Sequence, residues 1–260
     1  MDGTPNPRAS LRLKIRTMST TTGHALSLCM PSVRPRADAE TSIRSGWSYA
    51  RERGAQFVVS DNSRDPAKDA LLTELESEGL TCVHQAPAGE SDNWRSAFDA
   101  SGGTWVGFLS DDDLLLPLPG GQQHLEDHPD IAGYKPDIVI NSAGYGITDV
   151  LNFQVEAESA TERVMQYLRR NQGKNCALFS FFRRSLLGEL VELVNGHHPT
   201  RAGHTDWSTV LALVSTGKLL SDKSTLLVYN KIDRTTQEQV DASNRRIFTK
   251  VGLSERSRHF

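Results

Sequence analysis

Short apolar runs alternate with longer amphipathic runs from residue 25 to residue 109. The apolar runs are residues 25–30, 55–60, 80–85 and 104–109, and the amphipathic runs between them are 38–54, 67–79 and 91–103. This pattern is typical of parallel strands joined by crossover helices that cover the faces of the sheet. The alternation therefore predicts an α/β fold with an open, mostly parallel sheet flanked by helices.

The second half of the chain has a less regular pattern. It contains a predicted strand and turn, a helix, a strand leading into a helix, a further helix, a strand and a terminal helix, at residues 137–148, 159–171, 175–194, 206–217, 223–230 and 236–252. No internal repeat is evident. We expect an irregular C-terminal half of the same domain, with residues 236–260 forming a terminal helix and tail.

The N-terminus and the composition argue against several classes of protein. Residues 1–24 are polar and basic and lack the apolar stretch of a signal peptide, which predicts a disordered leader. No segment reaches the run of about 18 apolar residues that a transmembrane helix needs. The net charge is -3 and the Lys and Arg residues are scattered, so no basic stripe marks a nucleic-acid surface.

The cysteines indicate a reducing compartment. Cys29, Cys82 and Cys176 lie far apart, and none forms a CxxC pair. Their odd number and their spacing argue against a disulfide framework and against a zinc site. We therefore expect reduced thiols in a cytoplasmic protein.

Three consecutive aspartates, Asp111, Asp112 and Asp113, follow the apolar run at 104–109. Adjacent carboxylates repel one another, and in a partly desolvated site a bound cation relieves that repulsion. Mg²⁺ and Mn²⁺ prefer oxygen ligands, and such a cation would bridge to an anionic group such as a diphosphate. The alternative is that the aspartates are solvated loop acids or a helix cap.

Two other predicted strands also end in polar residues. "PSVRP" follows the strand at 25–30, and "DNSRD" follows the strand at 55–60. Ligands of open α/β sheets bind where the loops converge at the carboxyl ends of the strands. The three strand ends together predict a binding site at one edge of the sheet.

Four stretches of the chain carry a family resemblance when they are taken in order. They are ALSLCMPSVRP, FVVSDNSRD, NWRSAFDASGGTWVGFLSDDDLLLP and HTDWSTVLALVSTGK. Together they resemble a family 2 glycosyltransferase of GT-A fold, closely over residues 25–118 and loosely over 175–230. The resemblance implies an inverting transfer of a sugar from a nucleotide-sugar, with Mg²⁺ or Mn²⁺ on the diphosphate.

The resemblance implies donor-binding roles for residues of the first half. Pro31 and Ser32 match a loop that holds the base, whereas the role of Arg34 is open because this loop is one residue shorter. Asp61 matches an acid that accepts a hydrogen bond from the uracil imide, and its alternative is an Asx-turn. Asn93 matches a recurrent Asn of the helix before the metal strand, and its alternative is a helix cap.

The same resemblance assigns a position in the family's metal-binding motif to each of the three aspartates. Aligned on the family motif Asp-x-Asp, Ser110 takes the place of the first Asp and Asp111 takes the variable position. Asp112 then falls at the metal-binding Asp and Asp113 at an additional one. The resemblance thus implies Asp112 as the direct metal ligand and Asp113 as a second metal residue. The departure at Ser110 leaves open whether Asp111 takes over a ribose or a metal contact.

The family supplies its catalytic base from an acidic pair at the start of a late helix. The matching stretch is GHTDWSTV, where Asp206 stands at the Asp and Thr205 replaces the Glu. A carboxylate within hydrogen-bond reach of the acceptor hydroxyl takes its proton, so Asp206 is the predicted base. The alternative is an Asp placed to stabilise the start of a helix.

These expectations combine into one functional prediction. The chain moves one sugar from a UDP- or TDP-sugar to a hydroxyl of a small-molecule or glycan acceptor by an inverting, metal-assisted displacement. Residues 25–118 form the nucleotide-sugar-binding half, and residues 119–235 form the acceptor-binding half. Two alternatives stay open: a degenerate member that binds a nucleotide-sugar without transfer, and a sugar-1-phosphate nucleotidyltransferase. The second is disfavoured because PSVRPRAD contains no glycine for a phosphate loop.

Overall fold

The computed structural model of the protein describes residues 24–84, 89–121, 124–197 and 205–231, together with 236, 238–239 and 241–242. The predicted leader at 1–24 lies outside the described residues except for His24, and so does most of the predicted terminal helix at 236–252. Both expectations therefore stay predictions.

The first half of the chain is a series of strands and helices. Its elements are β1 (Leu26–Ser32), α1 (Arg36–Arg53), β2 (Gln56–Asp61), α2 (Pro66–Ser77), β3 (Thr81–His84), α3 (Glu90–Asp99) and β4 (Trp105–Phe108). Every element predicted here is present, with bounds shifted by a few residues. Strand β1 continues through Pro31, which is in register with Ser60 of β2. The Cys29 carbonyl bonds on the β4 side and the Ser32 carbonyl on the β2 side, so the Pro31 nitrogen faces the β4 side. The ladder with β4 ends at Cys29, so the missing N–H of Pro31 removes no ladder hydrogen bond.

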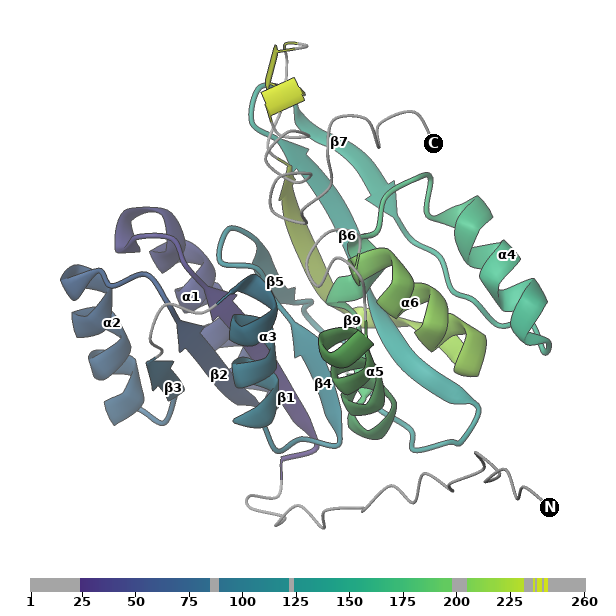
Figure 1. The fold of residues 1–260 in the computed structure, drawn as a ribbon, viewed down its shortest axis with the longest axis horizontal. Coiled ribbons are helices and arrows are strands. Elements are labelled where there is room, and N and C mark those ends of the chain that lie inside the picture. The colour runs from purple at the N-terminus through teal and green to yellow at the C-terminus, as the bar shows by residue number, and fades with distance from the viewer. Residues whose placement is uncertain are drawn as a thin grey trace, which may run out of the picture.

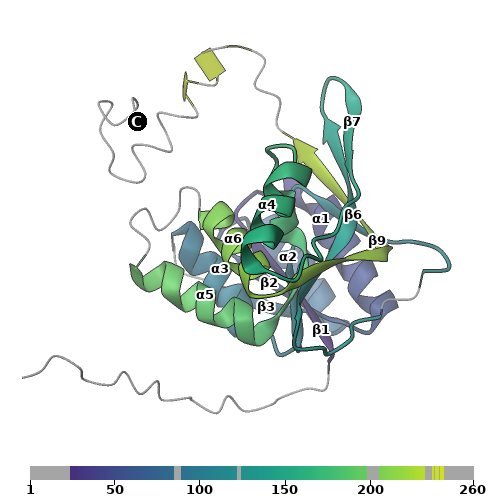
Figure 2. The same cartoon turned by 90° about the vertical axis from the view of Figure 1, so that its right-hand side faces the viewer.

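The second half adds strands and helices around the same sheet. Its elements are β5 (Leu114–Pro117), β6 (Ile131–Ser142), β7 (Gly146–Leu151), α4 (Ala160–Arg170), the 3₁₀ helix η1 (Cys176–Phe179), β8 (Phe181–Arg183), α5 (Arg184–His197), α6 (Thr205–Thr216) and β9 (Lys218–Lys231). The two longest strands, β6 and β9, pair in parallel, and β7 pairs with β6 in antiparallel orientation. Figure 2 shows β6 and β7 extending together beyond the rest of the sheet.

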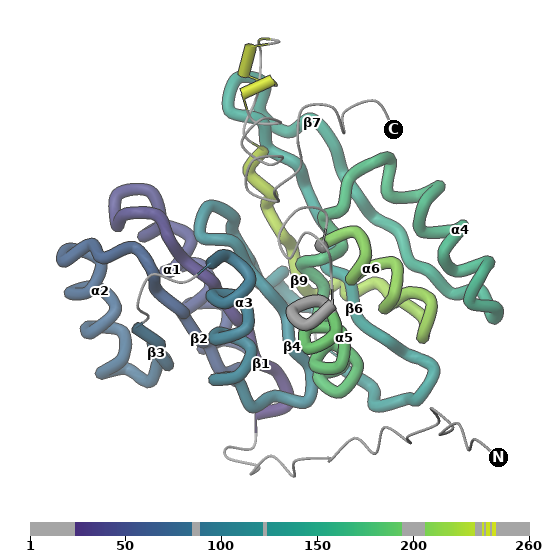
Figure 3. Tube along the Cα trace, in the orientation of Figure 1, coloured from purple at the N-terminus to yellow at the C-terminus, as the bar shows by residue number. Residues whose placement is uncertain are grey.

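The strands form one sheet in the order β3-β2-β1-β4-β8-β6-β9-β5, with β7 beside β6. Strands β1 to β4 pair in parallel, and the short β8 joins β4 to β6 through antiparallel pairings. Figure 1 shows this sheet with helices packed along it, and Figure 3 traces the two halves of the chain side by side. The predicted α/β fold with an open, mostly parallel sheet is confirmed.

The strand order reverses between β1 and β4, and this reversal positions the site. From β1 the chain moves outward to β2 and β3, and it then returns to place β4 on the other side of β1. The reversal leaves a crevice at the carboxyl ends of β1 and β4, and the loops that follow these two strands form one wall of it. Open α/β sheets bind ligands at such a point.

Helices cover both faces of the first half of the sheet. Ser60 donates a hydrogen bond to Asn93 of α3, whereas the next residue, Asp61, forms an ion pair with Lys68 of α2. Since successive side chains of a strand point to opposite faces, α2 and α3 lie on opposite faces of β2. Strands buried on both faces need continuous apolar runs, which explains the unbroken burial of Leu28, Cys29 and Met30.

No helix in the described part of the chain is both long enough and apolar enough to cross a membrane.

Gly103, between α3 and β4, allows a close backbone approach that can be tested. A Cβ atom at this position would lie 2.5 Å from the Ser27 backbone nitrogen, so Gly103→Ala requires backbone movement. We expect it to lower the free energy of unfolding by about 1–3 kcal/mol, as overpacking does. Gly144→Ala is the matched control because a Cβ there has no atom within 4 Å. Equal urea-denaturation midpoints for the two variants would contradict this account.

Candidate functional site

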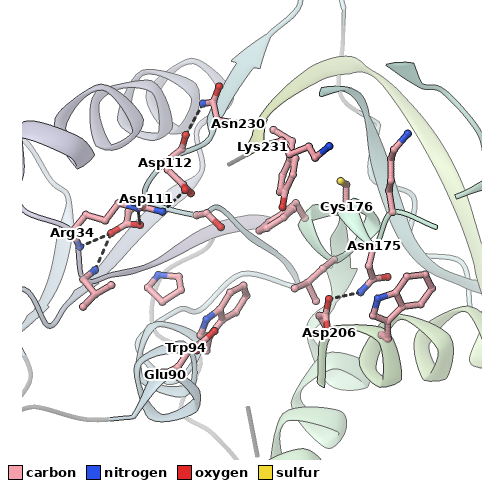
Figure 4. A pocket seen from close by; sticks show the side chains of 18 of the residues that line it. Arg34, Glu90, Trp94, Asp111, Asp112, Asn175, Cys176, Asp206, Asn230 and Lys231 are labelled. Carbon is pink, nitrogen blue, oxygen red and sulfur yellow. Dashed lines mark hydrogen bonds and ion pairs between the residues drawn. The ribbon is translucent and has the colours of Figure 1, made fainter. Parts of the chain in front are cut away.

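A cavity of about 1040 Å³ lies at the carboxyl ends of β1 and β4. One side of it is lined by the loops that follow these strands and by α3. The other side is lined by residues of η1 and by the start of α6. The end of β9 also borders the cavity, and its Asn230 side chain donates to the Asp112 carbonyl. Figure 4 shows Arg34, Asp111 and Asp112 on one side, with Asn175 and Asp206 on the other. The two halves of the chain thus meet around one space.

Asp111 binds the loop that follows β1. Its Oδ2 accepts hydrogen bonds from Ser32 Oγ at 2.7 Å, from the Val33 backbone nitrogen at 2.8 Å and from the Arg34 backbone nitrogen at 2.9 Å. Its Oδ1 accepts a hydrogen bond from Arg34 Nε at 3.1 Å. Both oxygens of this carboxylate are therefore engaged with the protein, and the loops after β1 and β4 are held together.

Asp112 lies on the cavity wall and pairs with Arg34. Arg34 Nη2 donates to Asp112 Oδ2, while the Arg34 side chain stays about one third exposed at 35%. Burial raises the pKa of the Asp112 carboxyl, with Asp111 adding to the increase and Arg34 opposing it. A half-buried carboxylate beside another carboxylate is favourable only with a cation nearby, and Arg34 supplies one positive charge here.

Asp113 is placed differently from its two neighbours. It is 1% exposed and is not among the residues that line the cavity. Its Oδ1 accepts a hydrogen bond from the Asn230 backbone nitrogen at 2.7 Å, and its buried Oδ2 has no hydrogen-bond partner among the described residues. Burial raises the pKa of Asp113 to about 7. The structure therefore does not bring the predicted second metal residue to the cavity.

Asp61 lies behind the cavity wall, in contact with a buried lysine. Lys68 Nζ is 2.7 Å from Asp61 Oδ1, and the two side chains are 0% and 2% exposed. Ser63 donates to Asp61 through its backbone nitrogen and its hydroxyl, which is the Asx-turn arrangement. The same Lys68 ammonium donates to Ser32 Oγ and to the Arg34 carbonyl. Asp61 is not a cavity-lining residue, so its predicted contact with a base stays a prediction.

Pro31 and Asn93 line the cavity, whereas Ser32 is buried beside it. Asn93 Nδ2 donates to the Ser32 carbonyl at 3.2 Å, and its Oδ1 accepts from Ser60 at 2.6 Å. Helix α3 begins at Glu90 with Gly89 as its N-cap, so Asn93 is not the capping residue. Its amide instead ties α3 to the ends of β1 and β2.

Asp206 lies in the first turn of α6, on the opposite wall of the cavity from Asp112. Asn175 Nδ2 donates to Asp206 Oδ2 at 3.1 Å, and Tyr167 donates to Asn175 Oδ1. Because its amide is held at both ends, Asn175 orients the carboxylate. Asp206 Oδ1 makes no hydrogen bond with a described residue.

Several residues of the cavity were not identified from the sequence. They are Glu90, Trp94, Lys174, Asn175, Tyr229 and Lys231. Lys231 ends β9, so its position at a strand end was a signal that could have been used. Lys174 and Asn175 lie in an irregular segment, and only tertiary packing brings them to the cavity wall, where Asn175 contacts Asp206.

Comparison with known proteins identifies the fold. No protein-family model matches the chain, and no curated protein matches it. The solved structure of S. aureus TarS 1–349 has a TM-score of 0.51 at 15% identity, covering 88% of this chain and 66% of that chain. The same protein in complex with UDP has a TM-score of 0.51 at 16% identity. The mannosyltransferase PcManGT from Pyrobaculum calidifontis, in complex with GDP-Man and Mn²⁺, has a TM-score of 0.53 at 14% identity.

The fold is of the GT-A type. At these identities the likeness is one of fold alone. The chain spans 66% of TarS 1–349 and 65% of PcManGT, which is less than two thirds of each. The GT-A part of the resemblance is confirmed, whereas membership of family 2 and the inverting mechanism stay predictions.

The buried Lys68–Asp61 pair gives a stability prediction. Lys68→Met leaves the Asp61 carboxylate buried without its cation, so we expect a loss of about 3–5 kcal/mol in the free energy of unfolding. Arg51→Met is the control, because Arg51 pairs with Glu78 at an exposed position and its loss should change little. Adding Asp61→Asn to Lys68→Met removes the unpaired charge and should recover part of the loss. Urea denaturation that shows no difference between Lys68→Met and Arg51→Met would contradict the assignment.

Proposed function

We propose that the chain is a glycosyltransferase that moves one sugar from a nucleotide-diphosphate sugar to an acceptor hydroxyl. The observation that carries this proposal is the set of side chains on the two walls of the cavity at β1 and β4. One wall bears Arg34 and Asp112 at the switch point of the sheet, and the opposite wall bears Asp206. The space between them suits a donor whose diphosphate lies at the first wall and whose sugar faces the second. The likeness of fold to a mannosyltransferase that binds GDP-Man and Mn²⁺ supports this reading.

The donor diphosphate binds at the wall formed by the loops after β1 and β4. Arg34 is already held there through Asp111, and its partly exposed guanidinium is suited to phosphate oxygens. Lys231 is exposed at the end of β9 and lines the same cavity. Two cations near a diphosphate lower the cost of bringing its charge into a partly desolvated site.

The residues present fit a hard divalent cation at Asp112. The Asp112 carboxylate lies on the cavity wall, and burial raises its pKa because the negative charge is partly removed from water. A bound cation would offset that cost by stabilising the charged carboxylate. Oxygen ligands suit Mg²⁺ or Mn²⁺, and either ion bound at Asp112 would stabilise the charge on the leaving diphosphate. Asp113 supports this position from behind: it accepts from the Asn230 backbone, and the Asn230 side chain donates to the Asp112 carbonyl.

Asp206 acts as the base of a single displacement with inversion. The acceptor oxygen forms a bond to the anomeric carbon while the bond from that carbon to the diphosphate oxygen breaks. The proton of the acceptor hydroxyl passes to the Asp206 carboxylate, and the bonding electron pair leaves with the diphosphate. Attack and departure occur on opposite faces of the sugar, which fits a base and a diphosphate site on opposite walls. Asn175 keeps the carboxylate turned toward the cavity.

The base of the donor is bound beside β1, with Pro31 and Asn93 on the wall. Asp61 contributes by holding Lys68 and, through it, the loop that carries Arg34. Residues 25–118 form the donor half, and residues 119–235 form the acceptor half. UDP and TDP are the first candidates for the donor nucleotide, and GDP is the comparison.

A binding protein without transfer activity is the second candidate. Ser110 lies on the cavity wall where an acid would be expected, and Thr205 precedes Asp206 in place of another. Arg34 also occupies one oxygen of the proposed metal ligand. Nucleotide-sugar binding without any release of nucleotide would favour this candidate over a transferase.

The metal assignment can be tested by calorimetric titration of UDP, TDP and GDP with Mn²⁺ and then with EDTA. We expect one nucleotide to bind with a clear dependence on the cation. Asp112→Asn should lose the cation-dependent part of this affinity because it removes the ligand charge. Asp127→Asn, at an exposed position outside the cavity, is the control. Full retention of Mn²⁺-dependent binding by Asp112→Asn would exclude it as the ligand, and no nucleotide binding by folded protein would exclude both candidate functions.

The base assignment can be tested by the steady-state release of nucleoside diphosphate from UDP- and GDP-sugars. Asp206→Asn should keep the donor affinity of the original chain and lower turnover by about 10²–10⁴-fold, as expected for loss of a general base. Asp99→Asn is the control, since Asp99 is exposed on α3 and pairs with Arg95. Unchanged turnover in Asp206→Asn would remove this residue from the mechanism.

A further inference from the structure

A second group of ligating side chains lies at the outer edge of the sheet, apart from the cavity. It consists of Glu76 on α2 with Cys82 and His84 on β3. One ligating atom from each of these side chains lies within 4.8 Å of the others. None of the three lines the cavity at β1 and β4. Figure 1 shows α2 and β3 at the left side of the domain, at the end of the strand order.

The register of the sheet explains why these side chains converge. His84 pairs with Asp61 and Cys82 pairs with Val59 on the neighbouring strand β2. Asp61 points toward α2, because its carboxylate contacts Lys68 of that helix. Side chains two apart on a strand share a face, so both His84 and Cys82 also point toward α2. Glu76 lies near the end of α2, only a few residues before β3. Since α2 packs beside β3, the Glu76 side chain lies close to Cys82 and His84.

The scaffold that holds this group is rigid. Leu72 and Leu75 of α2 and Leu80 before β3 are buried in the core. A single turn connects α2 to β3, with Gly79 at φ 109°. The backbone positions of Glu76 and Cys82 are therefore set by packing, which is what a preformed ligand set requires.

A further carboxylate lies beside the histidine. Asp69 is on the same helix as Glu76, and its Oδ1 is 3.7 Å from His84 Nδ1, which is an ion-pair contact and too long for a hydrogen bond. Asp69 adds negative charge next to the three ligating side chains, and this charge favours a cation there.

We propose that Glu76, Cys82 and His84 form a zinc site that ties the edge strand β3 to helix α2. Thiolate, imidazole and carboxylate are the ligand types that Zn²⁺ accepts together, with water completing a tetrahedron. A thiol is a poor ligand for the hard ions Mg²⁺ and Mn²⁺, so this site and the cavity select different cations. The exposure of Glu76 and His84 leaves a path for the ion to enter.

The local charges support a cation at this position. The Glu76, Asp61 and Asp69 carboxylates all act on the Cys82 thiol through their negative charges. These same negative charges attract a divalent cation, and a bound metal ion deprotonates a coordinating thiol. Neither Glu76 nor Cys82 makes a hydrogen bond with another described side chain that would compete with the metal.

The site can be tested on the full chain after removal of metals with a chelator. Zn²⁺ is titrated by competition with a chromophoric chelator, and Co²⁺ is used as a spectroscopic substitute. We expect one tightly bound ion and a thiolate-to-cobalt charge-transfer band. Cys82→Ser should abolish the band, and Glu76→Gln, an exposed substitution that spares the core, should weaken Zn²⁺ binding at least about tenfold. Asp69→Asn removes a negative charge beside the site but no ligand, so it should weaken Zn²⁺ binding less than Glu76→Gln does.

Two controls separate this site from the rest of the protein. Cys176→Ser alters another cysteine, which lies in the cavity, and Asp112→Asn alters the proposed cavity ligand. Neither should change Zn²⁺ affinity or the cobalt band, and Zn²⁺ should raise the Tm of the original chain but not of Cys82→Ser. The proposal is overturned if no Zn²⁺ binds, if the band survives Cys82→Ser, if Glu76→Gln leaves the Zn²⁺ affinity unchanged, or if the band is lost in a control variant.

Discussion

The buried ammonium of Lys68 is the interaction on which the shape of the cavity depends. It lies on α2, yet it contacts Ser32 and the Arg34 carbonyl after β1 and the Asp61 carboxylate at the end of β2. A charge without access to water is tolerated only when fixed partners replace that water. Ser32 in turn donates to Asp111, so the loop after β4 joins the same network. One buried charge thus sets the relative positions of three strand ends.

The three consecutive aspartates show how a strand end can give identical side chains different tasks. Asp111 turns toward the loop after β1 and uses both oxygens there. Asp112 faces the cavity and meets Arg34, while Asp113 turns inward to the backbone of Asn230. The three side chains are chemically identical, so their different surroundings decide their roles. Asp111 joins two loops, Asp112 is a candidate metal ligand, and Asp113 is a buried hydrogen-bond acceptor. The reversal of strand order between β1 and β4 places the three aspartates beside the crevice at the carboxyl ends of these strands.

The domain holds two polar groups of contrasting chemistry. The cavity presents carboxylate oxygens together with cations, which suits a phosphate-bound hard metal ion. The edge of the sheet presents sulfur, nitrogen and oxygen atoms within reach of one another, which suits zinc. The edge group lies on the strand-helix series of the first half, and so does the cavity wall that bears Arg34 and Asp112. Asp61 lies between them, since it pairs with Lys68 and is in register with His84.

The sequence alone was sufficient to predict the strand-helix series of residues 25–109 and a polar site at the strand ends that carry Arg34 and Asp112. Asp206 was assigned to the same site through the family resemblance, at the start of a predicted helix. Strand ends and helix starts are local features, and each of these residues follows such a feature directly. The burial of Lys68, the withdrawal of Asp113 from the cavity and the meeting of Cys82 with Glu76 were not predictable in the same way. They depend on which strands pair, in which register, and on which face each helix packs. Those choices are made by contacts between distant segments, because only the packed core decides which polar groups lose their access to water.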